Sequence, residues 1–449
     1  MKKFIFLFYA ACIALPLFAQ VKSREPIQQT ETTPIWDEGN QELTIIRYGI
    51  PYNGATSIVY RRDGKPILDV ELQTPVVVAV ASKPMEWGHF QFPRIYRSAG
   101  GLLVAKWQMA EDDVSAYGKL NEGFRLSSDN GKTWNISDQP APFGEGLLIP
   151  STGEHIAIAT PVPLDINELQ LPKPISTMMS YHRHFNIYRL SELPEVLQGV
   201  YLDRWDKNGV VSRIHAGLED PGAARHSDDS LFPVVWWGDM KLLPNNTIVA
   251  GIYPMWYERE TGGADLSGVS FYQSIDGGMN WKIKGKIPYR YDLTVDPNGN
   301  RRDALGFTEP GFEILSDGTF LCVLRTDGPM YISRSSDQGI TWSHAVPLTP
   351  NGVLPRLLQL DNGVLVLSSG RPGVQIRFSI DGKGEKWTDP FEMLPFNSPG
   401  DHFTCAYTQL LAIAPDRFLV IYSDFYYPDP VSGELRKAIM VREIKVTKK

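Results

Sequence analysis

The amino-acid sequence predicts an all-β protein, a six-bladed β-propeller of four-stranded antiparallel blades. Three observations support this prediction: the composition, a Ser-x-Asp-x-Gly-x-x-Trp motif that recurs along the chain, and a second pattern in which a proline precedes a glycine. The 449 residues include 39 Gly, 34 Pro, 20 Phe, 19 Tyr and 11 Trp, as is typical of many short strands joined by tight turns. No helical period of comparable strength is present.

Composition and charge exclude several classes of protein. Hydrophobic residues make up 43% of the chain and charged residues 21%, which rules out a disordered, collagen-like or coiled-coil protein. The 44 basic and 51 acidic residues give a net charge of -7, and no cluster of Lys and Arg stands out. A nucleic-acid partner is therefore not expected.

Residues 1–19 have the features of a signal peptide. Lys2 and Lys3 precede an apolar stretch over residues 4–18, and the small residue Ala19 follows at a suitable cleavage point. No later segment approaches the roughly eighteen uninterrupted apolar residues that a transmembrane span requires. We therefore expect an exported protein, either periplasmic or secreted. Lipid attachment at Cys12 is the less favoured alternative, because only a short apolar run precedes that cysteine.

The Ser-x-Asp motif indicates the tip of a β-hairpin. Three copies match it at residues 127–134, 274–281 and 335–342, and a fourth at residues 379–387 carries one extra residue. In such a tip the Ser and Asp side chains bond turn amides, the Gly adopts a positive φ, and the Trp covers an apolar patch. A calcium loop is excluded, because the alternating Asp or Asn ligands and the closing Glu are missing. No metal site is expected.

The second pattern lies upstream of the first and marks strand-turn-strand units. A proline precedes a glycine by eight residues over residues 93–101, 310–318 and 355–363, and weaker copies cover 236–246 and 407–417. In chain order, the interval between the copies at residues 93–101 and 236–246 has room for one more copy, which makes six units. Residues 86–449 are thus predicted to form the propeller. Residues 20–85 contain strand-like runs and either complete the ring or form a small leading module.

The two kinds of turn also predict where a functional site lies. If the glycine turns and the Ser-x-Asp tips lie at one end of the ring, the inner strands begin and the second strands end at the other. There, near the axis, a propeller has its natural pocket. The residues gathered at that end are Gln91, Glu309, Tyr407, Arg325, Arg371 and the loop over residues 109–114.

These residues resemble the sialidase (neuraminidase) family of six-bladed propellers, whose Ser-x-Asp motifs are known as Asp-boxes or BNR repeats. The resemblance covers roughly residues 86 to 425, and the stretches that carry it are 308–310 (Thr-Glu-Pro), 324–325 (Leu-Arg), 370–371 (Gly-Arg) and 405–408 (Cys-Ala-Tyr-Thr). It implies a retaining, exo-acting glycoside hydrolase that releases a terminal acidic sugar, sialic acid, from a glycan. Carbohydrate is the implied partner, no cofactor is implied, and we expect a monomer.

The resemblance implies a role for each residue. Sialidases use a tyrosine nucleophile, because a carboxylate nucleophile would be repelled by the carboxylate on the anomeric carbon of sialic acid. Tyr407 would be this nucleophile, and Glu309 would take its proton. Arg325 and Arg371 would bind the substrate carboxylate through charge-assisted, bidentate hydrogen bonds.

Two positions leave alternatives open. Either Asp113 or its neighbour Asp112 would protonate the leaving oxygen. The family's first blade begins Arg-Ile-Pro, whereas residues 91–93 here read Gln-Phe-Pro, so Gln91 stands where the family has a third arginine. Arg94 is the alternative substrate-binding residue, but alternation along a strand turns it away from the face of Gln91.

The replacement of that arginine affects the predicted substrate. A Gln donates hydrogen bonds to a carboxylate but brings no charge. A hydrolase or lyase that acts on another acidic sugar is therefore a second hypothesis, and a non-catalytic carbohydrate-binding propeller is a third. If the pocket still binds a carboxylate through Arg325 and Arg371, Gln91→Arg adds a third cation and should tighten the binding of sialic acid.

Overall fold

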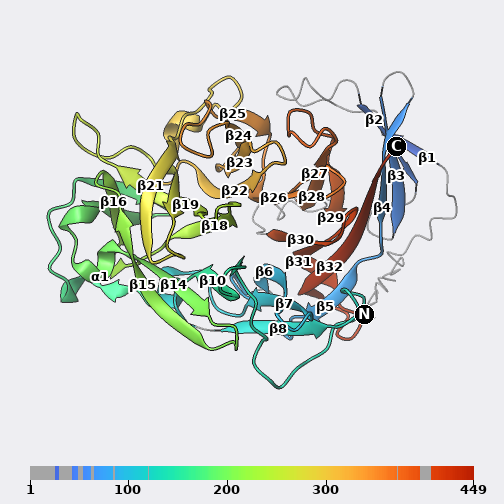
Figure 1. The fold of residues 1–449 in the computed structure, drawn as a ribbon, viewed down its shortest axis with the longest axis horizontal. Helices are drawn as coiled ribbons and strands as arrows, with labels where there is room; N and C mark the ends of the chain where they lie inside the picture. The colour runs from blue at the N-terminus through green and yellow to red at the C-terminus, as the bar shows by residue number, and fades with distance from the viewer. Residues whose placement is uncertain are drawn as a thin grey trace, which may run out of the picture.

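The computed structural model describes residues 26–29, 43–48, 54–61, 65–83, 86–119, 121–371, 373–394 and 406–449 (Figure 1). Strands dominate these ranges, as predicted. The helices there are short: α1 (Glu195–Gln198) and the 3-10 turns η3 (Val114–Ala116), η4 (Ile166–Glu168), η5 (Leu190–Glu192) and η6 (Gly299–Arg301). None of these helices is long and apolar enough to cross a membrane. The signal peptide expected at residues 1–19 lies outside the described ranges.

Three sheets are built from strands that follow one another in the chain, each paired antiparallel with the next. Such meanders are what the repeated strand-turn-strand pattern predicts. The three sheets are β6 (Gln91–Arg97), β7 (Leu103–Gln108) and β8 (Glu122–Ser127); β22 (Thr308–Ile314), β23 (Phe320–Arg325), β24 (Met330–Ser335) and β25 (Val346–Thr349); and β26 (Val353–Gln359), β27 (Leu365–Gly370), β28 (Val374–Ser379) and β29 (Phe391–Leu394).

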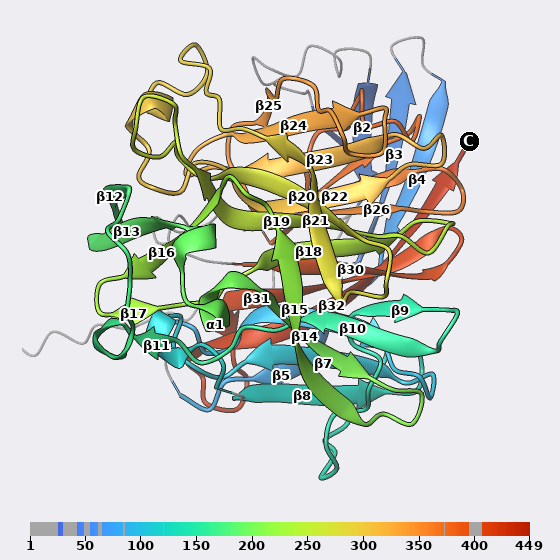
Figure 2. The same ribbon diagram turned by 60° about the vertical axis from the view of Figure 1, so that its left-hand side comes forward.

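A larger sheet of 13 strands covers the middle of the chain. It arises because β15 pairs in parallel with β21 and so joins two meanders edge to edge. The β12–β13 hairpin projects from one side of it (Figure 2). Its strands are β9 (Leu147–Ile149), β10 (Glu154–Ile158), β11 (Leu164–Asp165), β12 (Ser176–Ser180), β13 (Arg183–Arg189), β14 (Val200–Trp205), β15 (Val211–Glu219), β16 (Ala223–Asp228), β17 (Leu231–Phe232), β18 (Trp237–Leu242), β19 (Ile248–Tyr257), β20 (Gly268–Ser274) and β21 (Asn280–Ile287).

The last sheet joins the two ends of the described chain. Strand β32 is long enough to pair with β31 along one edge and with both β4 and β5 along the other. Strand β5 thereby adds a fourth strand beside β30, β31 and β32, and β1 to β4 extend outward from it (Figure 1). The strands are β1 (Pro26–Gln29), β2 (Leu43–Tyr48), β3 (Ala55–Arg61), β4 (Pro66–Leu72), β5 (Val76–Val80), β30 (Thr408–Ala414), β31 (Arg417–Pro428) and β32 (Leu435–Lys448).

The sheets are arranged around a common centre. Strands β18, β22, β26, β30 and β6 lie next to one another in that order and nearest the middle (Figure 1). Apolar side chains fill the space between neighbouring sheets, as between β22–β25 and β26–β29. The closed ring of six separate blades stays a prediction, because the 13-stranded sheet is continuous and β6–β8 has three strands.

The Ser-x-Asp motifs form turns at strand ends, as predicted. Ser335 Oγ donates to Asp337 Oδ1 (2.7 Å) and accepts from the backbone N–H of Gly339 (2.8 Å). Trp342 Nε1 then donates to the carbonyl oxygen of Gly339 (3.1 Å). The copies at residues 127–134 and 274–281 repeat these contacts. The aspartate oxygens accept from turn groups, which is the behaviour of a structural motif.

Candidate functional site

Three buried polar side chains from two sheets meet near the centre of the molecule. Glu309 lies at the start of β22, Arg325 ends β23, and Tyr407 precedes β30. Arg325 Nη1 donates to Glu309 Oε1 (2.6 Å) and to the Tyr407 hydroxyl (3.1 Å). The Tyr407 hydroxyl in turn donates to the same Glu309 oxygen. The structure therefore brings together three of the residues that the sequence singled out.

The environment keeps Glu309 and Arg325 charged. Burial opposes ionisation of Glu309, but the Arg325 guanidinium and the hydrogen bonds from Arg325, Tyr407 and the Leu354 backbone outweigh it and lower the pKa of Glu309. Burial likewise opposes the charge of Arg325, yet the Glu309 carboxylate raises the pKa of Arg325 well above its usual value. Glu309 is therefore an ionised carboxylate with a phenolic proton held against it.

A strained backbone conformation positions Glu309. Its φ of 46° is in the left-handed region, and Phe92 (51°) and Leu354 (42°), which also precede the first proline of an inner strand, share it. Each lies in a β-bulge, where the strand register shifts. Such a conformation is costly for a residue with a side chain and is concentrated at functional sites. The backbone N–H of Leu354 donates to Glu309 Oε2 (2.8 Å). The bulge at Leu354 therefore holds the Glu309 carboxylate of the neighbouring sheet in place.

The bulge places Phe92 beside the nucleophile candidate. The rings of Phe92 and Tyr407 meet edge to face, with centroids 5.0 Å apart and an interplanar angle of 73°. Val353 and Phe425 belong to the same buried apolar cluster as Tyr407. Edge-to-face packing of this kind fixes the orientation of an aromatic side chain. Phe92 thus occupies, in the first sheet, the bulge position that holds Glu309 in the β22 sheet.

Arg371 and Tyr181 lie on the same side of the molecule as the Glu309 cluster. Tyr181 forms the tip of the β12–β13 hairpin, and its backbone N–H donates to Asp303 Oδ2 (3.3 Å). The side chain is 60% exposed. Nevertheless, desolvation by the surrounding protein raises the pKa of its hydroxyl to about 12, and four charges act on it: Arg325, Asp327, Glu309 and Arg371. Tyr181 is therefore an exposed aromatic residue within electrostatic range of the charged site.

The two neighbouring aspartates differ in environment. Asp113 accepts the backbone N–H of Ser115 (2.9 Å), where it caps η3, and pairs with Arg183. The hydrogen bond from Ser115 and the contact with Arg183 lower the pKa of Asp113 to about 2. Asp112 is open to solvent and accepts from Trp87 Nε1 (3.2 Å). Although the side chain is exposed, the surrounding protein removes part of its hydration, and this desolvation raises the pKa of Asp112. The negative charge of Glu309 adds to the rise.

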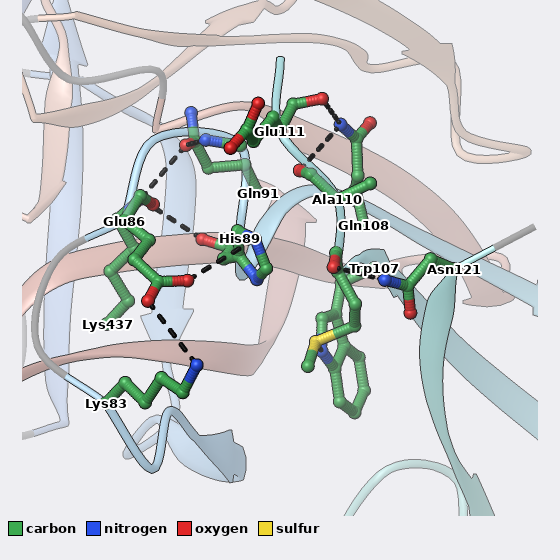
Figure 3. A network of polar contacts seen from close by, with 12 residues as sticks. Lys83, Glu86, His89, Gln91, Trp107, Gln108, Ala110, Glu111, Asn121 and Lys437 are labelled. Atoms are coloured by element: carbon green, nitrogen blue, oxygen red, sulfur yellow. Dashed lines mark hydrogen bonds and ion pairs between the residues drawn. The ribbon is translucent and has the colours of Figure 1, made fainter. Parts of the chain in front are cut away.

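Gln91 is buried beside Lys437. Its side chain is 0% exposed and its Oε1 accepts from Lys437 Nζ (2.9 Å) and from the backbone N–H of Gly88 (Figure 3). In the strand pairing Gln91 corresponds to Thr308, not to Glu309, because the bulge follows it. The prediction that Gln91 binds the substrate rested on matching Pro93 to the proline of the family's Arg-Ile-Pro, and the buried contact with Lys437 argues against that role.

Arg94 lies away from the Glu309 cluster. Its Nη1 is 2.6 Å from Glu145, and its Nη2 bonds Glu122. Lys106 bridges the same two carboxylates, at 2.7 Å from each. The four residues form an ion-pair network on the far side of the strand, as alternation predicts for Arg94. Among the described residues no group of three or more His, Cys, Asp or Glu could hold a metal ion.

Sequence reasoning missed four residues of the site. Phe92 and Leu354 carried a signal, because each precedes a proline at the start of an inner strand, as Glu309 does. Trp87 and Tyr181 carried none, since both come from segments outside the repeats.

Comparison with known proteins supports the fold. No family model and no curated protein matches the sequence. A protein of unknown function from Dyadobacter fermentans, at 17% identity and a TM-score of 0.54, covers 84% of this chain and 99% of its own. The NanB sialidase of Streptococcus pneumoniae (K499G mutant; 12% identity, TM-score 0.46) covers 90% of this chain and 83% of its own. The α-L-arabinanase of Penicillium chrysogenum (15% identity, TM-score 0.43) covers 82% of this chain and 98% of its own. The likeness to the Dyadobacter protein concerns the fold alone.

Proposed function

We propose that the protein is a retaining glycoside hydrolase in which Tyr407 is the nucleophile. The observation that carries this proposal is the buried contact of the Tyr407 hydroxyl with ionised Glu309 and with Arg325. A free tyrosine is a poor nucleophile near neutral pH, and an adjacent carboxylate that accepts its proton is the usual way to activate such a group. The Arg325 guanidinium, 3.1 Å from the phenolic oxygen, stabilises the phenolate that results.

The reaction proceeds in two displacements. As Glu309 takes the phenolic proton, Tyr407 attacks the anomeric carbon and the bond to the leaving oxygen breaks. Asp112 donates a proton to that oxygen, because its raised pKa favours the protonated form, whereas the lowered pKa of Asp113 favours the ionised form. Asp112 then deprotonates a water molecule that displaces Tyr407, and Glu309 returns its proton to the departing phenolate. Two inversions leave the configuration unchanged.

The substrate is a terminal acidic sugar, with sialic acid as the first candidate. Arg325 and Arg371 supply the positive charge that binds the sugar carboxylate. The choice of a tyrosine nucleophile fits a substrate whose own carboxylate would repel an aspartate or glutamate. A second candidate is another acidic sugar, because Gln91 is turned to Lys437 and does not complete a three-residue clamp. With the signal-peptide features of residues 1–19, the proposal places this activity outside the cytoplasm.

A panel of fluorogenic glycosides tests the proposal. We expect hydrolysis of a sialoside or of another acidic glycoside, with Tyr407→Phe inactive on the same substrate, and the first product should have the substrate's anomeric configuration by NMR. Matched uncharged glycosides are the control. Failure of the wild-type protein to hydrolyse any member, or normal turnover by Tyr407→Phe, would overturn the proposal and favour a non-catalytic carbohydrate-binding protein.

A further inference from the structure

A buried lysine organises the loop that precedes β6. Lys437, in β32, is 3% exposed. Its ammonium group donates to the carbonyl oxygens of Glu86 and His89 (3.1 Å to the latter) and to Gln91 Oε1 (2.9 Å), as Figure 3 shows. It also lies 4.5 Å from the centre of the Phe425 ring, within cation–π range. One cation thus contacts both ends of residues 86–91, although it lies about 350 positions later in the chain.

The loop held by Lys437 packs directly on the segment that carries Asp112. Gly88 has a φ of +88°, and a Cβ atom there would be 2.3 Å from both the Ala110 carbonyl oxygen and the Asp112 nitrogen. The two backbones are therefore in contact, and only glycine fits between them. From the same loop Trp87 Nε1 donates to Asp112 Oδ2 (3.2 Å), and the Trp87 ring meets Phe425 edge to face.

We infer that Lys437 is a positioning residue for Asp112, and that it acts through the loop at residues 86–91 and the indole N–H of Trp87. The inference rests on the proposed function in one respect, that Asp112 is the proton donor. Its physical basis is that buried acceptors need donors. Without the ammonium group, the Glu86 and His89 carbonyls and the Gln91 amide oxygen would lose it as a donor, and the loop would have to rearrange to reach water.

Rearrangement of the loop changes both the orientation and the titration of Asp112. The bond from Trp87 favours the ionised carboxylate, so its loss raises the pKa of Asp112 further. The other charged or titratable groups that act on Asp112 keep their places: Asp113, Glu309, Arg325 and Tyr117. Desolvation is the main cause of the raised pKa, and exposure of Asp112 to water would lower that pKa, so a rise in the Asp112 titration midpoint reports loss of the Trp87 bond.

The test compares Lys437→Met, Trp87→Phe and the double variant. Lys83→Met is the matched control, because Lys83 pairs with the Glu86 side chain of the same loop (3.7 Å) but is exposed. Carbon-13 NMR of the Asp112 carboxyl gives its titration midpoint without any substrate. We expect Lys437→Met and Trp87→Phe each to raise that midpoint by about one pH unit, the double variant to raise it no further, and Lys83→Met to leave it unchanged.

An unchanged Asp112 midpoint in folded Lys437→Met, or additive shifts in the double variant, would overturn the inference. If Lys437→Met does not fold, Gln91→Met replaces it, because it removes one acceptor of the ammonium group. Gln91→Met should raise the Asp112 midpoint by a smaller amount, and an unchanged midpoint in this variant would also overturn the inference. The kinetic counterpart uses leaving groups of different basicity. Lys437→Met should lose more turnover on a poor leaving group than on a nitrophenyl glycoside. If the wild-type protein hydrolyses nothing, the proposed function fails while the NMR result still decides the coupling.

Discussion

The hydroxyl of Tyr407 donates a hydrogen bond to Glu309, which precedes it by 98 residues. The lowered pKa of Glu309 determines which partner donates, because an ionised carboxylate in contact with a phenol accepts the proton. Arg325 contacts both partners, so the charge can move from the carboxylate to the phenolate without leaving the reach of the same guanidinium. The predictions below follow from this arrangement and from the groups around it.

Tyr407→Phe should abolish turnover while the protein remains folded. The substitution removes the oxygen that would bond the anomeric carbon but keeps the ring against Phe92. We expect kcat to fall by several orders of magnitude and the melting temperature to change little. Steady-state kinetics and a thermal melt measure the two quantities. Near-normal kcat with an unchanged melt would exclude Tyr407 as the nucleophile.

Glu309 should contribute to stability in a pH-dependent way. Because the folded-state pKa of Glu309 is below its ordinary value of 4.5, its contribution is fully present above about pH 4.5 and is lost as the pH falls through the folded-state pKa. Glu309→Gln removes this contribution and leaves Arg325 without its buried carboxylate, which costs about 3 to 5 kcal/mol near neutral pH.

Urea unfolding of wild type and Glu309→Gln at a series of pH values measures the difference. The gap in unfolding free energy between the two proteins should narrow as the pH falls below about 4.5. A gap that stays constant down to acid unfolding would show that Glu309 is not ionised in the folded protein.

Tyr181→Ala should weaken substrate binding more than it slows the reaction. The exposed ring stands beside the charged site, where it can stack on a sugar next to the cleaved bond. Loss of such a contact is worth about 1 kcal/mol, or roughly a fivefold rise in KM. Tyr181→Phe keeps the ring and serves as the control. Equal KM values for all three proteins would place the sugar elsewhere.

Local rules were sufficient to predict part of the fold and the meeting of three site residues. The Ser-x-Asp turns depend on contacts within a few residues, as Ser335 and Asp337 show, so their sequence contains the whole interaction. Glu309, Arg325 and Tyr407 meet because they stand at the same end of their sheets: Glu309 and Tyr407 where inner strands begin, and Arg325 where a second strand ends. Because the strand unit repeats, a pattern within each unit was enough to predict contacts between residues far apart in the chain.

Other features of the site depend on contacts that no local pattern encodes. Asp112 and Asp113 are neighbours in the chain, but their contacts differ. Trp87 donates to Asp112, whereas Arg183 pairs with Asp113. Gln91 was expected to bind the substrate because residues 91–93 were matched to the family's Arg-Ile-Pro. The bulge at Phe92 shifts the register there, and a pre-proline residue with positive φ is too uncommon to be expected from sequence.

The environment of Gln91 reverses the effect expected of Gln91→Arg. From the sequence this change would add a third cation to a carboxylate-binding pocket. In the structure it places a guanidinium against the Lys437 ammonium group, in a position that is 0% exposed. A second cation beside the Lys437 ammonium group costs about 3 kcal/mol or more, because the two like charges repel each other at a buried position. We therefore expect Gln91→Arg to unfold at a markedly lower temperature than wild type, with no gain in affinity for free sialic acid by calorimetric titration. Gln91→Met, which removes the amide but adds no charge, should be destabilised less. Tighter sialic acid binding by Gln91→Arg at unchanged stability would mean that residue 91 faces the pocket, and that the loop at residues 86–91 adopts a different conformation when substrate is bound.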